Sequence, residues 1–260
     1  MVGVKRTPAI PLPARDVRHL TSLRQLAGLM LVVFVSLAMP TLSSGQQNVP
    51  VAELVERFKS KQSFWEQFEV AEKLVSLRDK SALTPLEPYL TDEDRHERGN
   101  ASFVFAALGD DRGFEVIVAI LTDRANRQAG QGIPGGRWSL TAQIASDRYY
   151  AAHLLGDLKD PRAVPILIPL LKDHDVNMIV PWALGEIGDR AAIPALIQTL
   201  NDPNPDMRVL AIDGLETLKA KEALPQLQGL LSDHEKIHFD GLGTVAEAAK
   251  AAIAKLSTMP

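Results

Sequence analysis

The sequence predicts an all-α fold in which pairs of helices stack on one another, and three observations predict it. A segment of about 30 residues recurs along the chain. The second half of each copy repeats apolar residues at i, i+3, i+4 and i+7, which places them on one stripe of an α-helix. Aromatic residues make up only 5% of the chain, which favours layers of regular helices over a sheet-based core.

The first element, residues 1–45, is predicted to be an export segment. A basic stretch ends at Arg24, and the largely apolar residues 26–38 follow it. This apolar segment is shorter than the roughly 18–20 residues that span a bilayer. Ser43 and Gly45 suit the −3 and −1 positions of a cleavage site, with a new N-terminus directly after Gly45. We therefore expect a cleaved signal peptide and a periplasmic or secreted protein. An uncleaved membrane anchor and a buried core helix are the alternatives.

Charge and cysteine content exclude several classes of function. The net charge of −4 divides into +4 for residues 1–45 and −8 for the remainder, which holds 23 basic and 31 acidic residues. An acidic body argues against a nucleic-acid partner, because such proteins usually present a basic face. The chain has no cysteine, so disulfides, thiolate nucleophiles and cysteine-bound zinc are impossible.

The repeat is predicted to occupy residues 65–258, after a short lead-in at residues 46–64 that we expect to be helical. Three copies align closely, and their shared prolines, Pro165, Pro194 and Pro225, are 29 and 31 residues apart. Two more degenerate copies lie upstream, at residues 74–90 and 109–114. The predicted apolar stripes of the second helices are Phe114, Ile117, Val118 and Leu121, then Val164, Leu167, Ile168 and Leu171, then Ile193, Leu196, Ile197 and Leu200.

The turns have residues suited to helix ends. Asp160 is expected to cap a helix start, and Pro161 fits a first helical turn, where its missing N–H is not needed. Gly188 suits a helix end that needs a positive φ. An aspartate recurs after each second helix, at Asp173, Asp202 and Asp233. Pro181 lies inside a predicted first helix, and we expect it to kink or shorten that helix.

The segment Ala183-Leu-Gly-Glu-Ile-Gly-Asp-Arg-Ala-Ala-Ile-Pro-Ala-Leu196 resembles the HEAT family, in particular the HEAT-like repeats named after phycobilisome lyases. The resemblance implies a right-handed α-solenoid of about five HEAT-like helix pairs plus a C-terminal capping helix at residues 245–256. It also implies that the second helices line a concave surface, and such surfaces usually serve recognition. Pro181 and the missing glycines of the fifth copy depart from the family pattern.

A glycine-rich insertion at residues 125–141 interrupts the repeat. Gly130, Gly132 and Gly135 formally match a dinucleotide-binding fingerprint, but that site needs a preceding strand and a downstream acid, and neither is evident. We therefore expect no cofactor there. Insertions in solenoids often lie on binding faces. We assign the candidate partner contact to Arg137, Trp138, Tyr149 and Tyr150. The alternative is that Trp138 packs the loop onto the solenoid and that the tyrosines are ordinary helix surface.

Two His-Glu pairs, His96-Glu97 and His234-Glu235, raise the possibility of a metal enzyme. The HEAT-repeat deoxyhypusine hydroxylases use four such pairs placed symmetrically, whereas here two exist in different registers. We assign no catalytic and no metal-binding residue. The acids flanking His174 and His234 are expected to cap or solvate inter-repeat turns. Phycobilin lyases, which the repeat resembles, act inside cells, which does not suit an exported chain.

The sequence therefore predicts a non-catalytic scaffold of the cell envelope that binds another protein on its concave face or its glycine-rich insertion. The mature domain is not expected to enter a membrane. The alternative is a metal-dependent or lyase-type enzyme built on the same solenoid.

Overall fold

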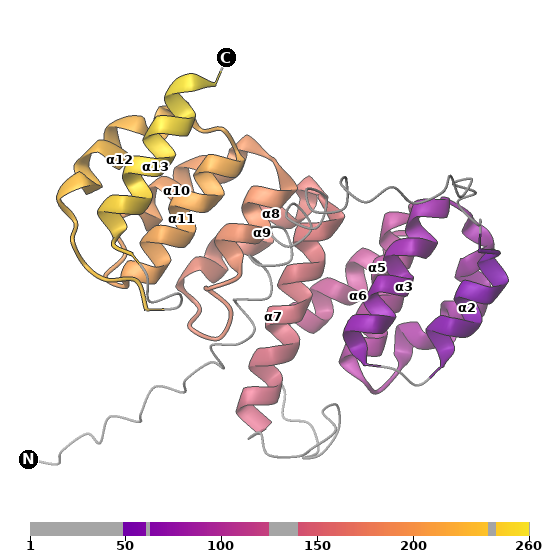
Figure 1. Cartoon of the computed structure of the whole chain (residues 1–260). Coiled ribbons are helices and arrows are strands. Elements are labelled where there is room, and N and C mark those ends of the chain that lie inside the picture. Colours follow the sequence, from indigo (N-terminus) through magenta and orange to yellow (C-terminus); the bar gives the residue numbers. More distant parts are fainter. Residues whose placement is uncertain (1–48, 61–62, 125–139, 239–242, 260) are drawn as a thin grey trace, which may run out of the picture.

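The computed structural model describes residues 49–60, 63–124, 140–238 and 243–259, and this part of the chain is a stack of helices (Figure 1). The α-helices are α2 (Val51–Lys59), α3 (Phe64–Leu77), α4 (Leu83–Leu86), α5 (Arg95–Ala107), α6 (Asp111–Thr122), α7 (Leu140–Leu158), α8 (Val164–Leu167), α9 (Val180–Ile187), α10 (Ile193–Thr199), α11 (Pro205–Thr217), α12 (Leu224–Gly229) and α13 (Val245–Thr258). The 3-10 helices are η1 (Lys80–Ala82), η2 (Glu87–Thr91), η3 (Pro161–Ala163), η4 (Ile168–Lys172), η5 (Arg190–Ala192), η6 (Lys221–Ala223) and η7 (Leu230–Ser232).

The helices alternate between two rows, which confirms the predicted α-solenoid. The first helices of the pairs are α3, α5, α7, α9 and α11. Each is followed by a second element, which is α6 in one pair and a short α-helix joined to 3-10 turns in the others. The final helix, α13, packs against α11 and α12, as a cap does. The first described helix, α2, lies within residues 46–64, for which the sequence predicts a helical lead-in.

The same turn joins the two elements of every pair. Its residue with positive φ is a glycine in two copies, Gly109 and Gly188, and a long polar residue in three, Arg78, Lys159 and Lys219. A side-chain oxygen of the next residue then accepts a backbone N–H two positions on, at Asp79, Asp110, Asp160 and Asp189. The loss of glycine in the fifth copy is therefore tolerated, since a non-glycine residue in this conformation costs only about 1–2 kcal/mol.

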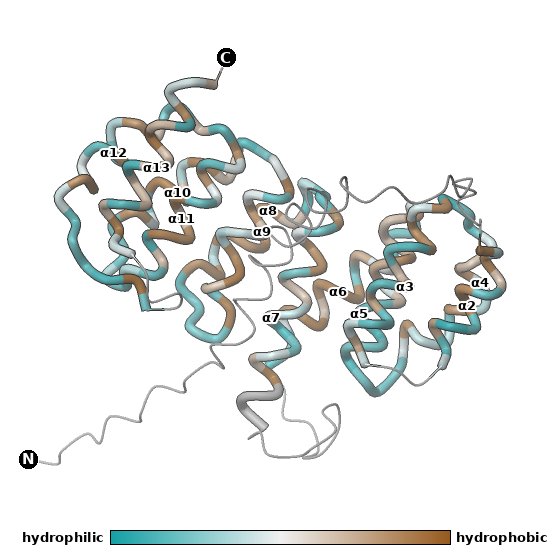
Figure 2. The backbone as a smooth tube through the Cα atoms, viewed as in Figure 1, coloured by the Kyte–Doolittle hydropathy of each residue, from teal (hydrophilic) through white to brown (hydrophobic). Residues whose placement is uncertain are grey.

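The predicted stripes of the second elements are buried in the core. Leu121, Leu167 and Leu196 have no exposed surface, and their stripe neighbours at the other positions are buried or nearly so. The i+4 members, Val118, Ile168 and Ile197, are only partly buried and pack against the edge of the core. Figure 2 shows hydrophobic stretches along the stacked helices, while many of the turns that join the helices are hydrophilic. Among the described helices, none is both long and apolar enough to cross a bilayer.

Pro181 shortens its helix, as the sequence predicts. Helix α9 has 8 residues, whereas α11, at the same place in the next pair, has 13. Pro181 lies within the first turn of α9, where no intrahelical N–H donor is required. The chain between Asp173 and Ile179 consists of turns instead.

Neighbouring first helices approach each other closely at three glycines. A Cβ atom added to Gly156 would lie 2.8 Å from Cζ3 of Trp182 and 3.0 Å from Cα of Ala183. One added to Gly185 would lie 3.2 Å from Cα of Gly214. At Gly214 itself, the added atom would lie 2.7 Å from the backbone oxygen of Pro181. The first helices therefore contact each other backbone to backbone, and the glycines make this possible.

The close approach at Gly214 generates a stability prediction. Gly214→Ala should lower the free energy of unfolding by about 1–3 kcal/mol, because the added methyl group meets backbone that cannot move away. This loss should outweigh the higher helix propensity of alanine. Chemical denaturation followed by circular dichroism would measure it.

The matched control is Gly229→Ala, because no atom lies within 4 Å of a Cβ added there. That variant should be neutral or slightly more stable, by up to about 1 kcal/mol. Equal effects of the two substitutions would contradict the proposed close packing.

Candidate functional site

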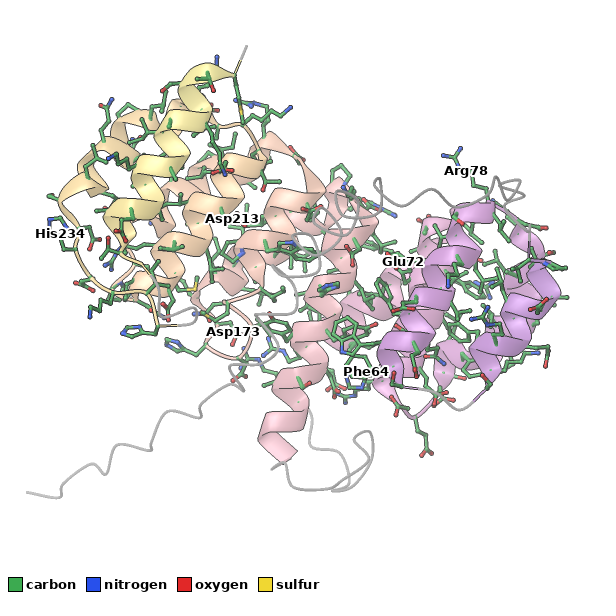
Figure 3. The ribbon with its side chains drawn as sticks, in the orientation of Figure 1. Phe64, Glu72, Arg78, Asp173, Asp213 and His234 are labelled. Atoms are coloured by element: carbon green, nitrogen blue, oxygen red, sulfur yellow. The ribbon has the colours of Figure 1, made fainter. Side chains whose placement is uncertain are left out.

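Aromatic side chains from three first helices form one continuous group at the centre of the stack. The His153 ring on α7 lies between Trp65 of α3 and Trp182 of α9. The ring centroids of Trp65 and His153 are 5.9 Å apart, and His153 stacks on Trp182 at 4.6 Å with an interplanar angle of 26°. Figure 3 shows the N-terminal end of α3, marked by Phe64, beside α7. We call Trp65, His153 and Trp182 the aromatic row.

Small residues let this row form across intervening helices. Helix α5 lies between α3 and α7 in the chain, and its Gly99 leaves room for Leu154 and Tyr150, which a Cβ would meet at 3.0 Å and 3.7 Å. The ring of Tyr150 therefore reaches α3, with its centroid 5.6 Å from that of Trp65. Gly156 likewise gives Trp182 the space to lie against α7. A side chain at Gly156 would displace the ring of Trp182, and one at Gly99 would press on Leu154 beside Tyr150.

A buried hydrogen-bond network lies beside the aromatic row and holds the side chain of Tyr150 in place. The Tyr150 hydroxyl donates to Oδ1 of Asn100. The amide nitrogen of Asn100 donates to Oε1 of Gln67 at 2.8 Å and to the backbone oxygen of Phe64 at 3.0 Å. Burial, followed by the charges of Asp157 and Glu72, raises the pKa of Tyr150 well above its usual value, so the hydroxyl keeps its proton. A satisfied network of this kind holds α3, α5 and α7 in one arrangement.

Carboxylates follow the rings one helical turn later. Asp157 follows His153 by four residues, and Glu186 follows Trp182 by four, so each acid shares a helix face with its ring. Nδ1 of His153 lies 3.0 Å from a carboxylate oxygen of Asp157. Nζ of Lys159 lies 3.3 Å from a carboxylate oxygen of Glu186. On α3, Glu72 lies two turns after Trp65, and Figure 3 shows it on the helix beside α7.

Negative charge is in excess beside the aromatic row. Loss of hydration by burial, and then the charges of Asp157 and Glu69, raise the pKa of Glu72 above its usual value. In the described part of the chain, neither Glu69 nor Glu72 has a lysine or arginine nitrogen within ion-pair distance. The surface thus combines partly exposed rings with carboxylates that repel one another. We call Glu69, Glu72 and Asp157 the acidic edge.

Buried arginines form a second repeating feature, and it joins neighbouring repeats. Arg148 donates to the backbone oxygen of Leu121 at 2.8 Å and to Asp173 at 2.6 Å. Arg208 lies 2.9 Å from Asp233 and 3.1 Å from Glu235, and Arg95 pairs with Asp123. Burial acts to raise the pKa of Asp173, but the hydrogen bonds from Arg148 and from the backbone of Asp175 outweigh it, and the net shift is downward. The acids beside His174 and His234 therefore hold the turn after a second element against the first helix of the same pair, while the bond from Arg148 to Leu121 reaches the preceding repeat.

The two His-Glu pairs have different structural roles. His96 is buried, its ring centroid 4.6 Å from that of Phe64, and its Nδ1 is 3.7 Å from Asp94 and 3.9 Å from Asp147. In the other pair, Glu235 contacts Arg208. Within the residues that the structure describes, no three side chains of histidine, aspartate or glutamate are grouped as a metal site requires.

The structure describes two of the four residues that the sequence assigns to a partner contact. Tyr150 is only 5% exposed and belongs to the interior network, not to the surface. Tyr149 is partly buried and packs against the core. Arg137 and Trp138 lie outside the described residues, so their role stays a prediction.

Sequence reasoning missed the aromatic row. The ring of Trp182 is partly buried and packs against the core. One signal was available, because His153 and Trp182 are 29 residues apart, the spacing of Leu155 and Leu184 in the repeat. Trp65 carries no such signal, because it lies at the very start of the repeat domain.

Comparisons with known proteins identify the repeat. A family model described as HEAT repeats matches residues 140–201 and 193–252. No curated protein sequence matches the chain.

Several solved structures are similar to it. The complex of CpcE and CpcF of phycocyanin lyase from Nostoc sp. PCC7120 is 19% identical, with a TM-score of 0.44 over 84% of this chain and 80% of that one. A designed armadillo repeat protein is 17% identical, with a TM-score of 0.42 over 80% of this chain and 100% of that one. Human deoxyhypusine hydroxylase in complex with glycerol is 20% identical, with a TM-score of 0.37 over 80% of this chain and 85% of that one.

The acidic edge generates a pH-dependent prediction. Because the pKa of Glu72 is higher in the folded chain than in the unfolded one, its ionisation opposes folding, and stability is lost as the pH rises through that raised pKa. Glu72→Gln should therefore melt at a higher temperature than the parent at pH 7. The difference should vanish below about pH 4, where the glutamate is also neutral.

Thermal melts across this pH range would test the prediction. The control is Glu115→Gln, an exposed carboxylate on α6 in the other row of helices, which should leave the melting temperature unchanged. A lower melting temperature for Glu72→Gln at pH 7 would show that the carboxylate stabilises the fold instead.

Proposed function

The chain carries HEAT repeats over residues 140–252, and on this premise we propose that it is a scaffold that binds a partner protein without catalysing a reaction. Solenoids of stacked helix pairs present long, continuous surfaces, and such surfaces usually serve recognition. The partner-binding surface in this proposal is the aromatic row with its acidic edge. It lies on first helices and replaces the concave face of the second helices, which the sequence favours.

The observation that carries the proposal is the exposure of Trp65. Its side chain is 41% exposed although it packs against Phe68, Tyr150 and His153. A tryptophan held rigidly by neighbouring rings offers a large apolar contact at little cost in conformational entropy, and tryptophan is enriched among residues that dominate binding energy. The network beneath it supplies the required rigidity.

Two further parts of the proposal come from the sequence. The basic and apolar order of residues 1–45 supports export, with the mature protein acting in the cell envelope. The glycine-rich insertion at residues 125–141 precedes and enters α7, the helix that carries His153. Arg137 and Trp138 therefore remain candidates for a second contact with the partner, together with Tyr149.

Site-specific crosslinking would test the binding surface in native cells. A photo-crosslinking amino acid at position 65 should give a discrete adduct with one protein, because this position is central to the surface. The matched control is position 77. Leu77 is also on α3 and is 37% exposed, but it lies at the opposite end of the helix.

The partner identified in this way should bind the Trp65→Ala protein about 30-fold more weakly, the loss of roughly 2 kcal/mol that is typical of a hot-spot tryptophan. Leu77→Ala should bind within twofold of the parent. Identical adducts at the two positions, or equal affinities of the two variants, would refute the assignment of this surface.

Export is tested by mapping the natural N-terminus. Mass spectrometry of the protein from an envelope fraction should find a chain that begins at Gln46. A chain that retains residues 1–45 in the membrane fraction would indicate an anchor instead. Recovery of the full chain from the cytosol would contradict export altogether.

A further inference from the structure

The proposed binding surface has two chemically different ends along α3. Trp65 marks the apolar end, and the acidic edge follows it, with Glu69 one helical turn and Glu72 two turns further along α3 and Asp157 on α7. Resting on the proposed function, we infer that the partner presents a basic segment, in which an apolar side chain packs on Trp65 while a lysine or arginine side chain binds the acidic edge.

Charge complementarity is the first argument. Glu69 and Glu72 are exposed on α3, and the carboxylate of Asp157 on α7 is partly exposed. After partial burial, the charges of Asp157 and Glu69 are the next causes that disfavour ionisation of Glu72. In the described residues, Asp157 pairs with His153, and Glu69 and Glu72 have no lysine or arginine within ion-pair distance. A cation placed among these groups relieves their mutual repulsion. The acidic body, −8 beyond residue 45, extends the attraction to longer range.

Spacing on the helix sets the geometry of the segment. Seven residues separate Trp65 from Glu72, which corresponds to about 10 Å along the helix axis at 1.5 Å per residue. In an extended peptide, side chains that face the same surface are two residues apart, which corresponds to about 7 Å at roughly 3.3 Å per residue. The long side chain of an arginine covers the remaining distance to Glu72. The segment that fits therefore carries its basic residue two positions from its apolar residue.

Other occupants fit this surface less well. A second copy of the chain would bring one acidic edge close to another acidic body, and like charges in contact oppose association. A nucleic acid would bring phosphates to the same carboxylates. Both arguments favour a basic polypeptide.

Synthetic peptides provide the test. The probe is a fluorescein-labelled peptide of glycine and serine that carries one leucine and, two residues later, one arginine, and its binding to the full chain is followed by fluorescence anisotropy. We expect saturable binding that weakens at least fivefold in Glu72→Gln and in Trp65→Ala. Binding should also weaken as salt is raised, because the surface charges are screened. A peptide with glutamate in place of arginine should show no saturable binding.

Two controls separate a change of recognition from a change of fold. Glu115→Gln removes the same charge from α6 and should leave peptide affinity unchanged. Glu72→Gln is expected to be at least as stable as the parent at pH 7, so weaker binding by this variant would not result from unfolding.

The inference is overturned if the arginine peptide fails to bind, if the glutamate peptide binds equally well, or if Glu72→Gln binds with parental affinity. If any of these results is obtained while crosslinking at position 65 still captures a partner, the binding surface stands and its preference for basic segments is wrong. If crosslinking at position 65 also fails, the proposed function falls as well.

Discussion

The close approach of neighbouring first helices is the constraint on which the rest of the structure depends. Gly156, Gly185 and Gly214 let the backbones of α7, α9 and α11 meet at distances that no side chain would permit. Close-packed interiors transmit small changes in volume, so this spacing fixes where every side chain on these helices can lie. The buried stripes of the second elements then fill the space on the other side of the stack.

The spacing of the helices also creates the aromatic row. Because α5 has a glycine at position 99, the ring of Tyr150 extends past α5 and contacts Trp65 of α3. The rings of Trp65, His153 and Trp182 then contact one another in sequence across α3, α7 and α9. The polar network through Asn100 holds α3, α5 and α7 together, and the bond from Arg148 to the backbone oxygen of Leu121 joins α7 to the preceding repeat. Helix packing therefore determines where the aromatic rings lie, and the buried hydrogen bonds hold the helices in this one arrangement.

The acidic edge carries a cost for the fold. Burial and neighbouring carboxylates disfavour the charged form of Glu72, and the structure keeps this unfavourable arrangement next to its exposed tryptophan. Binding sites commonly carry charges and apolar groups that the folded chain alone would not favour, because they are stabilised only when a partner is present. The exposed Trp65 ring and the carboxylates that repel one another lie on the same surface. This combination distinguishes the surface from the other described parts of the first helices.

The sequence by itself determined the repeat, the stripes of the second elements, the capped turns and the shortening of α9 at Pro181. Each of these depends on residues close together in the chain, and a period or a single residue type reports them directly. The same local patterns gave the resemblance to HEAT repeats, which the family match confirms for residues 140–252.

Only the tertiary structure decided which side chains meet. Tyr149 and Tyr150 are adjacent in α7, and the sequence assigned both to a partner contact, whereas only the packing shows that Tyr150 is buried and that its hydroxyl donates to Asn100 of α5. Trp65 and Trp182 lie in different repeats, and their common contact with His153 depends on the distance between helices. That distance results from packing summed over several repeats, and no local segment of the sequence contains it.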